Sequence, residues 1–161
     1  MDTEKLIADT PLTTLVIGVG NRDRGDDAVG PLVSSRLKRR AGHLNVLERT
    51  EAGLSLIDAW EGAGEVIILD AVRSGAAAGQ IHRIDASAHP IPADFFHCST
   101  HAFGVAESIE LARALCKLPP RVIVYGIEGA VFEAGAEMSA AVEKAADELE
   151  RLILKEFEPE G

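Results

Sequence analysis

The sequence predicts an α/β fold, a three-layer α/β/α sandwich around a twisted, mostly parallel sheet of five strands with one antiparallel strand. Apolar, β-branched runs alternate with amphipathic helical segments along the chain. These runs are apolar throughout, which is typical of strands covered on both faces of a sheet. One link, residues 71–80, has only about ten residues, whereas a parallel crossover needs a dozen or more, so we expect the fourth strand to run antiparallel to the third.

The expected elements follow from hydrophobic periodicity and from the residues that end each run. The strands are predicted at residues 12–19, 44–48, 65–70, 81–85 and 121–127. The helices are predicted at residues 26–40, 54–60, 102–118 and 139–157. In the last helix the residues expected to face inward are Val142, Ala145, Ala146, Leu149, Leu152 and Ile153, and those expected in solvent are Glu143, Asp147, Glu148 and Glu150. No repeat or Ser/Pro-rich linker interrupts the alternation, so we expect one domain over residues 1–161.

Composition excludes several classes of function. The chain has 161 residues, 47% of them hydrophobic, and a net charge of −10, which suits a folded domain and opposes binding to nucleic acid or to an anionic membrane surface. Apolar runs of about eight residues are far shorter than a membrane span, and the first residues lack a secretory signal. With only two cysteines, Cys98 and Cys116, we expect a reduced, cytoplasmic protein.

Polar residues that could carry chemistry gather at one predicted edge of the sheet. Ligands bind outside the carboxyl ends of the strands in open parallel sheets. The first strand leads to Asp26 and Asp27 at a helix start, the third ends in Asp70, and the segment before the helix predicted at residues 102–118 brings His101 to the same edge. Two carboxylates and an imidazole form an O, O, N ligand set for a divalent transition metal.

Some of these residues have structural explanations as well. Asp26 fits an N-cap, and Asp27 fits a first-turn carboxylate stabilised by the helix dipole. Asp70 closes an apolar run, and a carboxylate in that position needs a partner or a metal to offset its burial. His97 competes with His101 as the candidate histidine, and Cys98 is either a nucleophile or a buried thiol. His43, His82 and His89 receive no role.

A nucleotide-binding oxidoreductase is an alternative interpretation of the first loop. Gly18, Gly20 and Gly25 are spaced as GxGxxxxG rather than GxGxxG, although Glu48 lies at a suitable distance to bind a ribose. Acidic residues at the helix start would repel a pyrophosphate. The sequence contains neither a P-loop lysine nor a GxSxG nucleophile motif.

Four separated motifs resemble the hydrogenase maturation proteases, over a stretch that runs from residue 12 to residue 152. They are GVGN with GDDAVG at residues 18–30, the strand 66–70 followed by Ala71, STH with FG at residues 99–104, and YGIE at residues 125–128. The resemblance implies a five-stranded mixed sheet of phosphorylase/hydrolase-like type. It also implies an endopeptidase that removes the C-terminal extension of the nickel-iron hydrogenase large-subunit precursor after nickel insertion.

Within that family the metal-contacting residues correspond to Asp27, Asp70 and His101. Nickel is then carried by the precursor and no organic cofactor is needed. Asp27 and Asp70 are the catalytic candidates, with hydrolysis driven by a metal ion or by one aspartate acting as general base. Asp26 is a further candidate carboxylate. The segment 22–24 (RDR) departs from the apolar residues of many relatives and is a candidate for partner recognition. The remaining alternative is a non-catalytic, metal-dependent adaptor for the precursor.

Overall fold

The computed structural model describes residues 13–92 and 104–159 and contains the predicted five-stranded mixed sheet. The strands are β1 (Thr14–Val19), β2 (Asn45–Arg49), β3 (Glu65–Val72), β4 (Ile81–Asp85) and β5 (Arg121–Glu128). Their order across the sheet is β2-β1-β3-β5-β4. Four strands are parallel, and β4 pairs antiparallel with β5 at one edge. The strand after the short link, β4, is therefore antiparallel to the others, as the sequence predicts.

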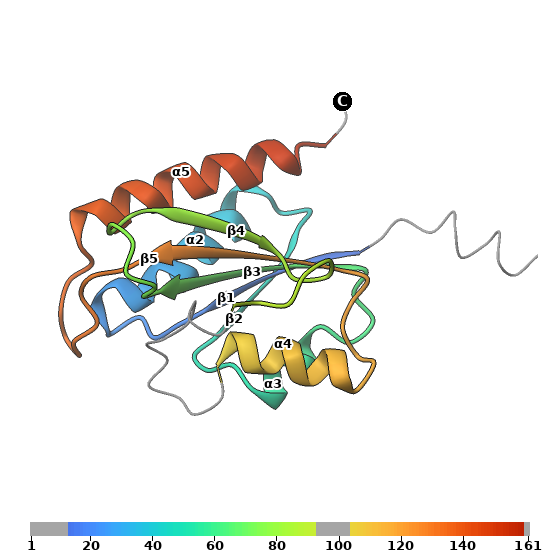
Figure 1. Ribbon diagram of the computed structural model, residues 1–161. Helices are drawn as coiled ribbons and strands as arrows, with labels where there is room; N and C mark the ends of the chain where they lie inside the picture. Colours follow the sequence, from blue (N-terminus) through green and yellow to red (C-terminus); the bar gives the residue numbers. More distant parts are fainter. Residues whose placement is uncertain (1–12, 93–103, 160–161) are drawn as a thin grey trace, which may run out of the picture.

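Helices cover both faces of the sheet, which confirms the three-layer arrangement (Figure 1). They are α2 (Val29–Arg40), α3 (Leu54–Ala59), α4 (Val105–Ala114) and α5 (Ala140–Glu156), with a 3-10 turn, η1 (Gly25–Ala28), before α2. One face carries α2 and α5 over a core that includes Ile67, Leu69 and Ile123. The other face carries α3 and α4 over a core that includes Ile68, Val122 and Trp60.

Element boundaries differ from the prediction at two places that affect the site. The strand β3 continues to Val72, so Asp70 lies inside the strand and not at its end. The expected helix from residue 26 begins as the 3-10 turn η1, and the α-helix starts only at Val29. Both differences are shifts of a few residues at element ends, where local periodicity gives little information.

The end of α4 also lies earlier than expected. The helix stops at Ala114, and Cys116 takes a left-handed backbone conformation with φ of 56°. The amide of Lys117 donates to the carbonyl of Ala112 at 2.8 Å, which closes the helix end. Cys116 is therefore exposed and does not continue the buried stripe of the helix.

Two glycines let α2 lie very close to the sheet. A Cβ atom on Gly30 would approach the carbonyl oxygens of Val19 and Leu69 to 2.5 Å, and one on Gly18 would approach the carbonyl oxygen of Gly30 to 2.5 Å. Only residues without a side chain permit this contact. As a result, η1 is held against the carboxyl ends of β1 and β3. Within the described residues, none of the helices has both the length and the apolar character that a bilayer crossing requires.

Candidate functional site

Asp27 is presented by η1 at the carboxyl edge of the sheet. Its carboxylate Oδ2 accepts a hydrogen bond of 2.8 Å from the amide of Asn21, in the loop that follows β1. Its own amide donates to the carbonyl of Arg24 at 3.1 Å. The side chain is partly exposed. The loop therefore fixes the carboxylate while leaving it accessible at the edge of the site.

Asp70 lies close enough to Asp27 for the two carboxylates to interact. It shares the face of Ile68, because alternate residues of a strand point to the same side, and this is the face covered by α3 and α4. Burial raises the pKa of Asp70 well above its usual range, the charge of Asp27 raises it further, and the amide of Ala71 opposes both effects. A pair of neighbouring carboxylates in which one resists ionisation is suited to binding a cation or to proton transfer.

Asp26 has a structural role that differs from the predicted N-cap. It lies within η1, is fully buried, and directs its carboxylate away from its own helix. Oδ2 accepts the amides of Ala130 and Val131 at 2.7 and 2.9 Å, and Oδ1 accepts the amide of Ser139 at 2.8 Å. The Ser139 hydroxyl donates to the same carboxylate. Asp26 therefore ties the loop before α5 to the loop that carries Asp27, and the N-cap interpretation is wrong.

Three of the candidate residues, His97, Cys98 and His101, lie outside the described residues. Among residues 13–92 and 104–159, no group of three or more His, Cys, Asp or Glu side chains is placed to hold a metal ion. The described structure thus brings Asp27 and Asp70 together. The assignment of His101 as the third ligand stays a prediction from the family resemblance.

A second polar cluster, which the sequence interpretation missed, lies on the same face as Asp70. Glu128 ends β5 with 1% of its surface exposed, and its carboxylate accepts the amide of Ser74 at 2.9 Å and the Ser74 hydroxyl. The Nε2 atom of His82 lies 3.3 Å from Glu128 Oε1. In the sheet register, His82 and Asp70 flank Gly126. The available signal was a carboxylate closing the apolar run of β5, the same pattern that identified Asp70.

The two arginines of segment 22–24 have separate partners. Arg22 donates from Nη2 and Nε to the two oxygens of Glu48, at 2.6 and 3.3 Å, and from Nη2 to the hydroxyl of Ser35 at 2.9 Å. It thus connects the first loop to α2 and β2. Arg24 turns the other way and donates from Nε to the carbonyl of Phe132 at 3.3 Å. Because Glu48 binds Arg22, it is not a free acceptor for a ribose.

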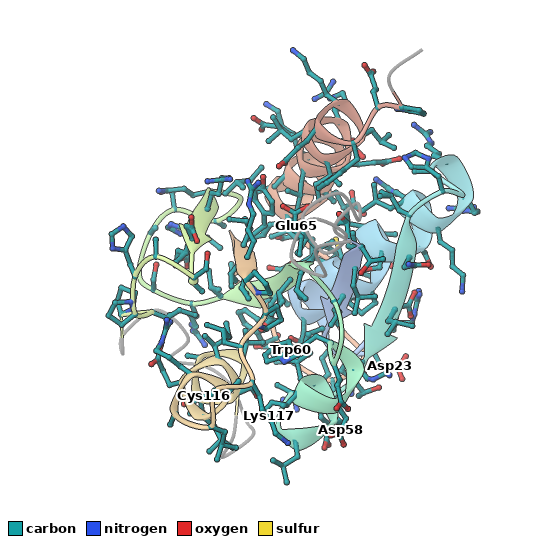
Figure 2. The ribbon with its side chains drawn as sticks, turned by 90° about the vertical axis from the view of Figure 1, so that its right-hand side faces the viewer. Asp23, Asp58, Trp60, Glu65, Cys116 and Lys117 are labelled. Atoms are coloured by element: carbon teal, nitrogen blue, oxygen red, sulfur yellow. The ribbon has the colours of Figure 1, made fainter. Side chains whose placement is uncertain are left out.

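A pocket at the opposite edge of the sheet is separate from the two carboxylates. It lies between the ends of α3 and α4, and its lining includes Asp58, Trp60 and Lys117, which are labelled in Figure 2. Its walls come from residues that precede β3 and β5, whereas Asp70 lies near the carboxyl end of β3. The buried Trp60 Nε1 has no acceptor among the described residues. This pocket therefore lies at the amino ends of β3 and β5, away from Asp27 and Asp70.

Comparison with known proteins identifies the family to which this chain belongs. The family model described as "HycI: Hydrogenase maturation protease" matches residues 31–156. That stretch is more than half of the chain and includes Asp70 and the YGIE motif. The chain belongs to the hydrogenase maturation protease family.

Individual relatives agree with this assignment. The chain is 26% identical over 117 residues to the hydrogenase expression/formation protein HupD of Thiocapsa roseopersicina, and the match spans 71% of this chain and 53% of that relative. The chain therefore spans about half the length of this curated relative.

Solved structures share the fold. The hydrogenase maturating endopeptidase HybD from Escherichia coli superposes with a TM-score of 0.75 at 22% identity, covering 90% of this chain and 91% of that chain. The endopeptidase HycI from Escherichia coli gives a TM-score of 0.69 at 25% identity, covering 87% and 88%. These similarities confirm the mixed-sheet α/β fold.

Proposed function

We propose that this protein is an endopeptidase that removes the C-terminal extension of a nickel-iron hydrogenase large-subunit precursor after nickel insertion. The observation that carries the proposal is the coupling of Asp27 and Asp70 at the carboxyl edge of the sheet, in a chain of the hydrogenase maturation protease family. A partly buried carboxyl with a raised pKa beside a second carboxylate is an arrangement typical of functional sites.

The pair suits recognition of nickel that the precursor already carries. Two neighbouring carboxylates repel each other, and contact with a divalent cation relieves that repulsion and favours the ionised form of Asp70. We propose Asp27, Asp70 and His101 as the residues that contact this substrate-borne metal. Nickel is then a sign that insertion is complete, and the protein needs no organic cofactor of its own.

Hydrolysis requires that a water molecule lose a proton as it attacks the scissile carbonyl. Asp70 is suited to act as the general base, because a raised pKa brings a carboxylate closer to the operating pH. The amide of Asn21 keeps Asp27 oriented toward the same edge. We propose that Asp27 holds the metal-bearing end of the precursor while Asp70 takes the proton. Activation of the water by the metal itself is the competing route.

The test follows the mass of the large subunit. The precursor that co-purifies with this protein is prepared with and without nickel and incubated with the wild-type protein. We expect loss of the extension only from the nickel-loaded form. Asp27→Asn and Asp70→Asn should each abolish trimming, while Asp147→Asn, which changes an exposed carboxylate on α5, should trim normally.

Different outcomes exclude different parts of the proposal. Equal trimming of both forms, or undiminished trimming by Asp70→Asn, would remove nickel recognition by this pair. Binding of the precursor without any change in its mass would instead support the adaptor. Tight nickel binding by the isolated protein, with chelator-sensitive cleavage of generic peptides, would indicate a self-contained metallopeptidase.

We also propose that the reaction takes place in the cytoplasm, the compartment that the sequence predicts.

A further inference from the structure

A groove lined by charged side chains lies between α2 and α5. Figure 1 shows these two helices on the same face of the sheet, which is the face opposite Asp70. The groove has a volume of about 640 Å³, and its walls come from the last turns of α2 and the middle of α5. Its lining residues are Arg36, Arg39, Arg40, Asp147, Glu150 and Arg151. We refer to these six residues as the α2/α5 groove.

The two carboxylates of the groove are already paired with arginines. Arg36 Nη1 lies 2.7 Å from Asp147 Oδ1 and 3.4 Å from Glu150 Oε2. Arg40 Nε lies 3.2 Å from Glu150 Oε1. Four guanidinium groups thus face two carboxylates, so the groove is locally positive in a chain whose net charge is −10.

Arg39 and Arg151 carry the excess positive charge, one on each wall. Both residues are exposed, and neither has a carboxylate within ion-pairing distance among residues 13–92 and 104–159. The walls are held together because α5 packs on α2, and His43 Nε2 lies 2.8 Å from the carbonyl of Phe157, which joins the ends of the two helices. The two guanidinium groups are therefore carried on a rigid base.

The chemistry of the lining indicates which ligand fits. A guanidinium group presents planar N–H donors that match a carboxylate, and two such groups on opposite walls suit a ligand with at least two carboxylates. The lining offers no aliphatic or aromatic residue to an apolar ligand. The net charge of −10 repels a dense polyanion such as nucleic acid, whereas a peptide with a few Asp or Glu side chains carries less charge and meets less repulsion.

We propose that the α2/α5 groove binds an acidic segment of a partner protein. The groove and Asp70 lie on opposite faces of the sheet, so the segment would leave the two carboxylates of the candidate site accessible. The inference does not depend on the proposed function, because binding at the groove is measured without any cleavage.

The chain provides two matched controls for this groove. Lys38 is exposed, precedes Arg39 on the same helix and does not line the groove, so Lys38→Gln removes a charge but none of the groove's donors. Asp147→Asn acts in the opposite direction, because it removes a lining carboxylate and releases Arg36 for the ligand.

The experiment measures the Kd of fluorescein-labelled octaglutamate by fluorescence anisotropy, with octaglutamine as the neutral probe. We expect the wild-type protein to bind octaglutamate alone, and more weakly in about 150 mM than in about 10 mM NaCl. Arg39→Gln and Arg151→Gln should each raise Kd about 3- to 10-fold, and Lys38→Gln by less than about twofold. Asp147→Asn should lower Kd, a gain that partial unfolding would not produce.

Three results would overturn the inference. Equal affinity for the two peptides would exclude recognition of carboxylates. An equal loss of affinity in Lys38→Gln and Arg39→Gln would show general attraction to the end of α2 rather than binding in the groove. Inorganic polyphosphate of the same charge is the competitor, and it should displace octaglutamate only in excess. Displacement at a much lower concentration than that of unlabelled octaglutamate would identify a phosphate site instead of a docking site for a protein segment.

Discussion

The carboxylate of Asp26 accepts the backbone amide and the hydroxyl of Ser139, at 2.8 and 3.0 Å, across 113 residues of sequence. The same carboxylate binds the amides of Ala130 and Val131. A buried acid with this many donors organises the loop before α5. The loop that carries Asp27 is consequently supported by the C-terminal part of the chain.

Asp26→Ala should therefore destabilise the protein strongly. The change leaves three backbone amides without their acceptor, and we expect a loss of at least about 3 kcal/mol in the free energy of unfolding, measured by urea denaturation. Asp26→Asn should cost less, because one oxygen remains as acceptor. Asp23→Ala, at an exposed position in the same loop, should change stability by less than about 0.5 kcal/mol. A loss below about 1 kcal/mol for Asp26→Ala would contradict the structural role.

Gly30→Ala should disturb the packing of α2 on the sheet. The added methyl would lie 2.5 Å from two carbonyl oxygens of the backbone, which cannot move independently of their strands. We expect a net loss of about 1–3 kcal/mol in thermal or urea unfolding, despite the higher helix propensity of alanine. Gly42→Ala is the matched control, because no atom lies within 4 Å of the added methyl, and it should be neutral or slightly stabilising.

Asp70→Asn should stabilise the metal-free protein at neutral pH. The pKa of Asp70 is raised in the folded state, so the unfolded chain ionises first as the pH rises, and folding loses stability until the pH exceeds the folded pKa. Asparagine lacks this penalty. The melting temperature of the variant should exceed that of wild type at pH 7, and the difference should shrink toward zero at about pH 2.5 and below, well under the unfolded pKa of about 3.9, where aspartate is protonated in both states. An equal difference at both pH values would show that ionisation is not its cause.

Arg22→Ala should have a small effect on stability that depends on salt. The Arg22 and Glu48 side chains are 52% and 38% exposed, so water and ions screen their interaction. A double-mutant cycle with Glu48→Ala should give a coupling of about 0.2–1 kcal/mol at low ionic strength, and less in 1 M NaCl. A coupling above about 2 kcal/mol would require a degree of burial that this pair does not have.

The sequence was sufficient to predict the order of strands and helices along the chain and the direction of β4, because hydrophobic period and link length are local properties.

Which residues of α5 are buried and which are exposed was harder to predict. Leu152, expected to face inward, is 46% exposed, and Glu150, expected in solvent, is 5% exposed. Glu150 lies beside the side chains of Arg36 and Arg40, since α5 packs on α2, and the contact between the two helices is not encoded in either one.

The site shows the same division between local and long-range information. Asp70 was recognisable because it follows an apolar run, and the coupling to Asp27 follows from parallel strands that end at one edge. The partners of Asp26 lie 104 to 113 residues away, so a local capping rule assigned it the wrong contacts. Glu128 closes an apolar run as Asp70 does, but its contact with His82 depends on the antiparallel pairing of β4 with β5, which neither strand encodes alone.

Asp26 and Asp27 are adjacent in sequence but differ in what their loss would mean. A library of variants scored only on precursor trimming would rank both positions as indispensable. If resistance of each variant to a nonspecific protease is scored in parallel, the two positions separate, because only substitutions at Asp26 should produce chains that are readily degraded. Inactivity at position 26 would therefore report on folding rather than on a third carboxylate in the reaction.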